Sequence, residues 1–289
     1  MGCGRTWEAA IGIDVVLAVL GAALLHATWN ALAHGMDDRL AGFTLMALSY
    51  AAVGGVAALC TGFPSAAAWP YVLASAAAHV LYQVGLMLSY RLGQFGQVYP
   101  LARGTAPWVV ALVSATVLGQ RISAPELAGV LVISAGLMSL VLVGGRPTAA
   151  RSPASAAAFG TGLMIALYTV LDGVGVHRTD VLTYGAWLFL LQGLALPPLA
   201  LAVRGRALPG QLRSAPGGAL LGGVLSLAAY GIVLWAQTRG ALAPIAALRE
   251  TSIVFGALIG AVLFREHLGR GRVVASAVVL AGIVLLNLP

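Results

Sequence analysis

The sequence predicts an all-α membrane protein that crosses the bilayer many times, and three observations support this fold class. Hydrophobic residues make up 60% of the 289 residues and charged residues 9%, whereas a globular domain is about 45–50% apolar and about 25% charged. The mean hydropathy is +0.94. Glycine, proline and charged residues also divide the chain into apolar runs of about twenty residues, which is the length a helix needs to cross a membrane.

Ten such runs predict ten transmembrane helices joined by short loops. The first run has no charged segment before it and no cleavage site after it, so we expect it to be a span and not a signal peptide. The predicted spans cover roughly 13–33, 40–61, 70–90, 95–118, 126–144, 156–176, 181–203, 215–237, 241–264 and 271–288.

The two halves of the chain align with each other, which predicts an internal duplication. One shift of the chain places Arg103 on Arg249, and a slightly shorter shift places Asp38 on Asp180. Because each half contains five spans, an odd number, the second half must enter the bilayer in the opposite sense, as in the inverted repeats of secondary transporters. The predicted units are a first repeat at 1–144, a linker rich in Pro, Ser and Arg at 145–155, and a second repeat at 156–289.

Two arginines lie near the middle of predicted spans, Arg103 in the fourth and Arg249 in the ninth. A charge at that depth costs about 2.5–3.5 kcal/mol, so it usually faces a wet cavity or a partner. Each arginine either binds an anionic substrate group through its planar guanidinium or holds the bundle together by pairing with a carboxylate or with helix-end carbonyls. Pro100 and Pro107 flank Arg103, and Pro244 precedes Arg249, which predicts kinked or broken spans there.

Two acidic residues also lie in predicted spans. Glu250 follows Arg249 directly, and since consecutive helical residues point about 100° apart, Glu250 could instead face Arg103. Asp172 lies in the sixth span but close to its end, where a solvated position is the alternative to burial. Either carboxylate could bind and release a proton during transport, whereas a static ion pair would only stabilise the bundle.

Polar residues at helical spacing mark further faces that are not expected to meet lipid. His26, Trp29 and Asn30 share one face of the first span. The third and eighth spans carry similar faces, and each face either makes hydrogen bonds between helices or lines a cavity. The candidate substrate-binding residues are Arg103, Arg249, Glu250, Asn30, His26, His79, Tyr82, Tyr230 and Trp108, with Gln83 and Gln237 on the same polar faces.

Several segments resemble the EamA-type transporters of the drug/metabolite transporter superfamily. They are LLHATWNALAHG in the first span, VYPLARGTAPW in the fourth, ALYTVLDGVG in the sixth, and ALRETSIVFGALIGAVLFREHLGRGRVVASAVVLAGIVLL in the last two. The resemblance implies ten helices around a central cavity lined by spans 1, 3, 4, 6, 8 and 9. It also implies export or uptake of amino acids, metabolites or other small polar compounds, and some similar sequences occur in phosphonate-related contexts.

The sequence therefore predicts a secondary active transporter, working by alternating access, for a small polar metabolite with a carboxylate or phosphonate group, such as an amino acid. The expected partners are this substrate and the lipid of the cell membrane, with coupled protons, and the chain is expected to act as a monomer or homodimer. The arginines are scattered singly, so nucleic-acid binding is not expected. No pattern for a cofactor, a metal site or ATP binding is present. The rival function is a membrane-embedded enzyme acting on a lipid-linked or phosphorylated substrate.

Membrane orientation is predicted differently by two arguments. Ten arginines fall in the odd-numbered loops and four in the N-terminal tail and even-numbered loops. Because arginine accumulates in cytoplasmic loops, this bias favours both termini outside the cell. The family resemblance implies both termini inside. We follow the arginine bias.

Overall fold

A computed structural model describes residues 12–34, 36, 38–93, 95–143, 152–214, 217–263 and 269–286, and these residues form helices joined by short turns without any strand. Part of the predicted linker, 145–151, lies outside them. The helices are α1 Ile13–His34, α2 Arg39–Thr61, α3 Trp69–Leu92, α4 Phe95–Thr116, α5 Ala124–Val143, α6 Ser152–Gly175, α7 Val181–Arg204, the 3₁₀ turn η2 Gly205–Ala207, α8 Leu208–Ser214, α9 Gly218–Gln237, α10 Leu242–Arg249, α11 Ser252–Leu263 and α12 Arg270–Leu286.

The described residues confirm an all-helical protein with several helices capable of spanning a membrane. Seven helical segments are long and apolar enough to cross a membrane, and two shorter apolar helices lie within α5 and α12. The count of ten spans stays a prediction. The outer faces are apolar, as lipid contact requires. Their most exposed large side chains include Leu17, Val56, Leu59, Leu182, Val203, Val262 and Val284.

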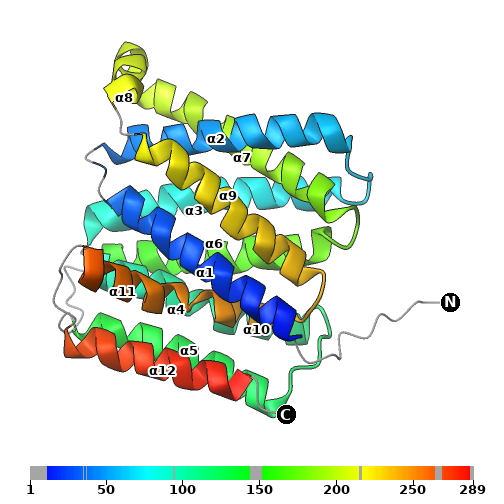
Figure 1. Cartoon of the computed structure of the whole chain (residues 1–289), viewed down its shortest axis with the longest axis vertical. Helices are drawn as coiled ribbons and strands as arrows, with labels where there is room; N and C mark the ends of the chain where they lie inside the picture. The colour runs from blue at the N-terminus through cyan, green and yellow to red at the C-terminus, as the bar shows by residue number, and fades with distance from the viewer. Residues whose placement is uncertain are drawn as a thin grey trace.

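Successive long helices run back and forth across the molecule and pack in pairs (Figure 1). The most extensive contacts join α2 to α7, α3 to α6, α5 to α12 and α1 to α9. Two of these pairs approach closely at glycines. A Cβ at Gly129 of α5 would lie 2.7 Å from the carbonyl oxygen of Gly282 in α12, and one at Gly54 of α2 would lie 2.5 Å from the Leu190 nitrogen of α7.

The predicted ninth span differs most from the expected single helix. It consists of α10 and α11, which follow one another across the molecule (Figure 1) and are separated by a turn at Glu250 and Thr251. The prolines do not cause this break, since Pro244 lies in the first turn of α10. The fourth span, by contrast, is one continuous helix in spite of Pro100 and Pro107.

Candidate functional site

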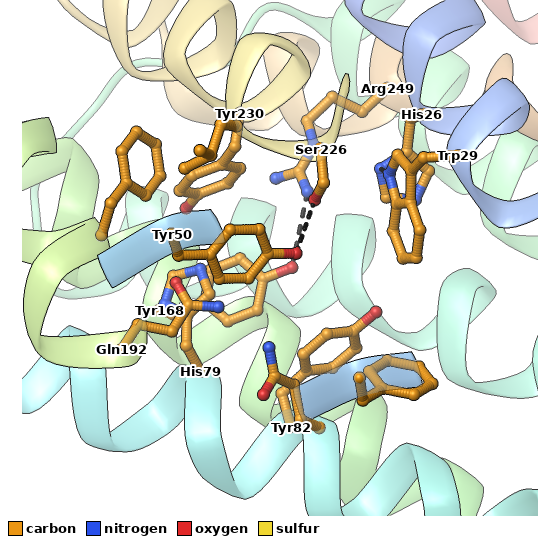
Figure 2. Close-up of a pocket in the computed structure, with 14 residues that line it drawn as sticks. His26, Trp29, Tyr50, His79, Tyr82, Tyr168, Gln192, Ser226, Tyr230 and Arg249 are labelled. Atoms are coloured by element: carbon orange, nitrogen blue, oxygen red, sulfur yellow. Dashed lines mark hydrogen bonds between the residues drawn. The ribbon is translucent and has the colours of Figure 1, made fainter. Parts of the chain in front are cut away.

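A central cavity lies between seven helices and is lined mainly by aromatic and polar side chains (Figure 2). Its empty volume is about 550 Å³, including the part open to solvent. The lining residues are His26, Trp29, Phe43, Tyr50, His79, Tyr82, Gln83, Tyr168, Phe189, Gln192, Ser226, Leu227, Tyr230 and Arg249.

A second, smaller cavity of about 230 Å³ adjoins the first. The two cavities share three lining residues, His26, Tyr230 and Arg249, so these side chains stand at the junction. The other residues around the smaller cavity are Ala22, Ala23, Arg103, Ala229 and Val233. Both predicted intramembrane arginines therefore reach the same space, Arg249 from α10 and Arg103 from α4.

Arg249 is buried among hydroxyl groups and aromatic rings. Its Nη1 donates to Oγ1 of Thr169 and its Nη2 to the hydroxyl oxygen of Tyr168, both at 3.4 Å. The guanidinium also lies 5.4 Å from the ring centre of Tyr230. Within the part of the chain that the structure describes, Arg249 forms no ion pair with a carboxylate. Its positive charge is therefore available to an anion in the cavity.

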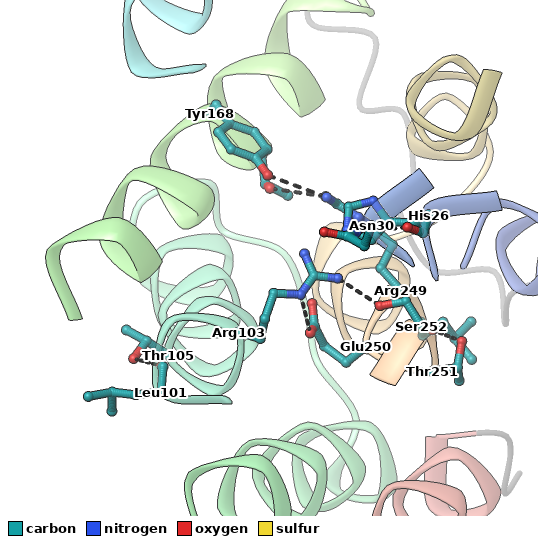
Figure 3. A network of polar contacts seen from close by, with 12 residues as sticks. His26, Asn30, Leu101, Arg103, Thr105, Tyr168, Arg249, Glu250, Thr251 and Ser252 are labelled. Carbon is teal, nitrogen blue, oxygen red and sulfur yellow. Dashed lines mark hydrogen bonds and ion pairs between the residues drawn. The ribbon is translucent and has the colours of Figure 1, made fainter. Parts of the chain in front are cut away.

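Arg103 has a carboxylate partner (Figure 3). Its Nε lies 3.0 Å from Oε2 of Glu250, and its Nη2 donates to Oγ of Ser252 at 3.0 Å. The ion pair is not aligned as a directed hydrogen bond, and Nη1 of Arg103 has no hydrogen-bond partner among the described residues. The expectation that Glu250 could face Arg103 and not its neighbour Arg249 is confirmed.

The break between α10 and α11 explains why Glu250 pairs with Arg103 and not with its neighbour Arg249. The backbone at the break switches to short-range bonds, from the Glu250 nitrogen to the Ala247 oxygen at 3.0 Å and from the Thr251 nitrogen to the Leu248 oxygen at 3.1 Å. The Thr251 hydroxyl also donates to the Leu248 oxygen at 2.8 Å. Arg249 thereby ends α10, while Glu250 in the turn and Ser252 at the start of α11 face Arg103.

Asp172 is fully buried, so the alternative of a solvated position is wrong. Its Oδ1 accepts a hydrogen bond from the Tyr184 hydroxyl at 2.8 Å, and its Oδ2 accepts one from the Tyr230 hydroxyl. Tyr184 can cover this end of α6 because Gly175 has no side chain in the place of the tyrosine ring. Asp172 thus contacts a cavity residue without lining the cavity itself.

The histidines and tyrosines predicted as site residues converge at the cavities. His26 lines both cavities, and its Nδ1 lies 3.2 Å from Nε1 of Trp29. His79 stacks on Tyr168 with the ring centres 3.9 Å apart, and its Nδ1 lies 3.0 Å from the Ser75 carbonyl oxygen. Tyr82 lies on the wall below them in the view of Figure 2.

Three other residues from the predicted polar set lie elsewhere. Asn30 donates to the His26 carbonyl oxygen of its own helix at 2.7 Å, and Trp108 packs against an apolar core cluster. Neither residue lines either cavity, so their role as substrate contacts stays a prediction without geometric support. Gln237 is buried and donates to the Thr169 carbonyl oxygen at 3.3 Å.

Four polar residues of the larger cavity were missed by the sequence analysis. The Tyr50 hydroxyl donates to Oγ of Ser226 at 3.1 Å, which joins α2 to α9 in the wall of the cavity (Figure 2). Tyr168 lies one helical turn before Asp172, a spacing that could have identified it. Gln192 interrupts an otherwise apolar span, as the predicted site residues do. Among the described residues no cluster of three metal-ligating side chains occurs.

Comparisons with known proteins agree with this arrangement. The EamA-like transporter family matches residues 153–288. No curated protein sequence matches the chain. Among solved structures, one titled only "Crystal structure of protein" is 21% identical in sequence, with a TM-score of 0.76, over 95% of this chain and 98% of the other. At this identity the likeness establishes the fold alone.

Proposed function

Because residues 153–288 belong to the EamA-like transporter family, we propose that the whole chain is a secondary active transporter that works by alternating access. The family match of residues 153–288 and the seven helices able to span a membrane support a multi-pass membrane protein of the drug/metabolite transporter superfamily, which we place in the cell membrane. The family consists of transporters, and we propose no enzymatic activity. The cavity lies between helices of both halves of the chain, as alternating access requires.

We further propose that the chain is an inverted repeat of five plus five spans, with the units predicted from the sequence. Helix packing supports this, since exchanging the halves turns the α3–α6 pair into the α9–α1 pair and leaves α2–α7 and α5–α12 unchanged. The first helices of the halves, α1 and α6, run in opposite directions (Figure 1). Asp38 and Asp180, which align in the sequence, cap corresponding helices α2 and α7 through hydrogen bonds to backbone nitrogens.

The substrate we propose is a small metabolite with a carboxylate or phosphonate group. The observation that carries this proposal is Arg249, which is buried, reaches both cavities and has no carboxylate partner in the described part of the chain. A guanidinium presents parallel N–H groups that match two oxygens of such a group. Hydrogen bonds to a charged group contribute about 1.5–3 kcal/mol each, which is enough to select anions.

We assign proton coupling to Asp172 and not to Glu250. Glu250 lies 3.0 Å from Nε of Arg103, so its carboxylate is already engaged in a buried ion pair. Among the described residues, Asp172 accepts hydrogen bonds from hydroxyl groups only, and one of its donors, Tyr230, lies against the Arg249 guanidinium. A proton on Asp172 would change the hydrogen bond to Tyr230 and so the position of the tyrosine in the cavity.

The test uses purified protein in proteoliposomes. Uptake of small carboxylates and phosphonates is measured as exchange for internal substrate and as accumulation driven by a pH gradient. We expect Arg249→Ala to abolish both activities, while Arg91→Ala, which removes an exposed arginine at the end of α3, leaves them unchanged. Transport by Arg249→Ala at the wild-type rate would refute the anion site.

Asp172→Asn separates transport from coupling. We expect this variant to retain substrate exchange and to lose accumulation driven by the pH gradient. The asparagine keeps the size of the side chain and an oxygen that accepts from tyrosine, but it cannot carry a proton. Unchanged gradient-driven accumulation would remove Asp172 from the mechanism without affecting the transport proposal.

A further inference from the structure

The walls of the two cavities carry an unequal set of charges. Their lining residues include two arginines but no aspartate or glutamate, a statement restricted to the residues that the structure describes. The charge of Arg103 is offset by Glu250 at 3.0 Å, behind the cavity wall. Arg249 therefore faces the substrate as the lining arginine that has no carboxylate within ion-pair distance among the described residues.

The remaining carboxylates are not placed to meet a cation in the cavity. Asp172 is the nearest to the junction, but the Tyr184 and Tyr230 hydroxyls occupy its two oxygens, and Tyr230 stands between it and the cavities. The other acidic side chains in the described ranges lie at helix ends; they are Asp14, Asp38, Glu126 and Asp180.

The larger cavity offers neutral hydrogen-bonding groups at positions away from Arg249. Gln192 lies on α7 and Gln83 on α3, and the Gln83 side-chain oxygen has no hydrogen-bond partner among the described residues. The Tyr50 and Ser226 hydroxyls lie on the same cavity wall, bonded to each other (Figure 2). These groups can donate to and accept from hydroxyl or carbonyl groups of a ligand, but they supply no negative charge.

We infer that the site selects organic anions that carry neutral polar groups and no ammonium group, hydroxy acids and not amino acids. The inference rests on the proposed function and narrows its substrate class. The anionic group pairs with Arg249, and the Arg103 Nη1 group, which has no other partner in the described part of the chain, donates to it from the smaller cavity. An ammonium group on the same ligand would lie near a guanidinium without a carboxylate to offset it.

Aromatic faces could in principle hold an ammonium group instead. Two tyrosine faces beside Arg249 are already used by a cation, because the Arg249 guanidinium lies 5.4 Å from the Tyr230 ring centre and 6.0 Å from that of Tyr168. His79 stacks on Tyr168 as well. An α-ammonium group is only two bonds from its carboxylate carbon, so it cannot reach the more distant rings while the carboxylate stays on Arg249.

The experiment compares isosteric pairs that differ in one group. Binding of phenyllactate against phenylalanine, and of lactate against alanine, is measured by calorimetry on the purified full chain in detergent. We expect each hydroxy acid to bind at least about tenfold more tightly than its amino acid, and Arg249→Ala to abolish binding of the hydroxy acids. Equal or tighter binding of the amino acids overturns the inference, and so does a lack of binding by every member of both pairs.

A second variant tests the charge argument directly. Gln192→Glu adds a carboxylate to the wall of the same cavity at nearly constant size. Its charge acts through the low-dielectric interior without contacting the ammonium group, and we expect it to reduce the preference for phenyllactate over phenylalanine by about tenfold. The matched control Gln192→Met removes the amide without adding charge and should leave that preference unchanged. An unchanged preference in Gln192→Glu, or an equal change in both variants, contradicts the inference.

The outcome separates this inference from the proposed function. If proteoliposomes take up amino acids better than hydroxy acids, the selectivity is wrong and transport stands. If hydroxy acids bind selectively but are not taken up, transport is refuted and the selectivity of the site remains.

Discussion

The pairing of Arg103 with Glu250 predicts a specific pattern of stability changes. Both side chains are almost completely buried, 2% and 3% exposed, so neither charge can be solvated if the other is removed. Stranding one member of a buried pair costs about 3–5 kcal/mol, whereas replacing both members by neutral residues is often close to neutral. Nε of Arg103 and Oε2 of Glu250 are close but are not aligned as a hydrogen bond. We therefore expect Arg103→Met to lower the free energy of unfolding by about 3 kcal/mol, the lower end of that range.

The double variant Arg103→Met/Glu250→Gln should recover most of this loss. Its residual cost should be about 1 kcal/mol, since Ser252 loses one hydrogen-bond donor. Arg249→Met is the matched control, because it removes a buried arginine that has no carboxylate partner in the described residues and whose two hydrogen bonds are long, at 3.4 Å. We expect it to change stability by less than about 1 kcal/mol.

The measurement is reversible unfolding in mixed micelles, followed by the fluorescence of the six tryptophans. The free energies of unfolding of wild type, the two single variants, the double variant and Arg249→Met form a double-mutant cycle with its control. Additive losses in the double variant, or a loss in Arg103→Met no larger than in Arg249→Met, would refute the distinction between a paired and an unpaired arginine.

Three further changes test other parts of the structure. Gly129→Val should lower the free energy of unfolding by about 1–3 kcal/mol, since a Cβ would lie 2.7 Å from the Gly282 oxygen. The control Gly21→Ala should not lower it, because a Cβ at Gly21 would meet no atom within 4 Å. A loss in Gly21→Ala as large as that in Gly129→Val would contradict the packing argument. A cysteine at Gly210, in an otherwise cysteine-free chain, should resist a membrane-impermeant maleimide in intact cells, while one at Ala66 should react; strong labelling at Gly210 would overturn the orientation favoured by arginine bias. Arg249→Lys should restore little of the transport lost in Arg249→Ala, because an ammonium lacks the bidentate fork; wild-type transport would show that charge alone suffices.

Much of the fold could be predicted because membrane spans are coded by local composition. The lengths of the apolar runs, and the glycine, proline and charged residues between them, predicted the helices with small errors at their ends. Helical spacing identified cavity-lining residues such as His26, His79 and Tyr82. The break between α10 and α11 was predicted for the right span but the wrong cause. It occurs at Glu250 and Thr251, where side chains bond across helices, and not at Pro244, which lies at the start of α10.

Residue depth along a span was a weaker guide than expected, as Asp172 shows. It stands close to the end of α6, where a solvated carboxylate was an open alternative, yet Tyr184 from the next helix covers it completely. The burial of Asp172 depends on which side chain a neighbouring helix places over it, and local sequence does not reveal how the helices pack. Gln192 and Tyr50 were not predicted as site residues for the same reason, since only the packing of the helices shows that they line a cavity together with Arg249.

The two aligned arginines differ in their partners, and this difference links the proposed repeat to the proposed binding of an anion. Both halves carry an arginine at the same place, but Gly104 follows the first and Glu250 the second, so the aligned segments contain two positive charges and one negative charge. A symmetric repeat would leave both arginines unpaired or pair both of them. Glu250 reaches across to the arginine of the other half, because the helix ends at Arg249 and the chain turns at the acid. This ion pair is one of the contacts between the halves, and it leaves Arg249, at the junction of the two cavities, as the positive charge available for the substrate.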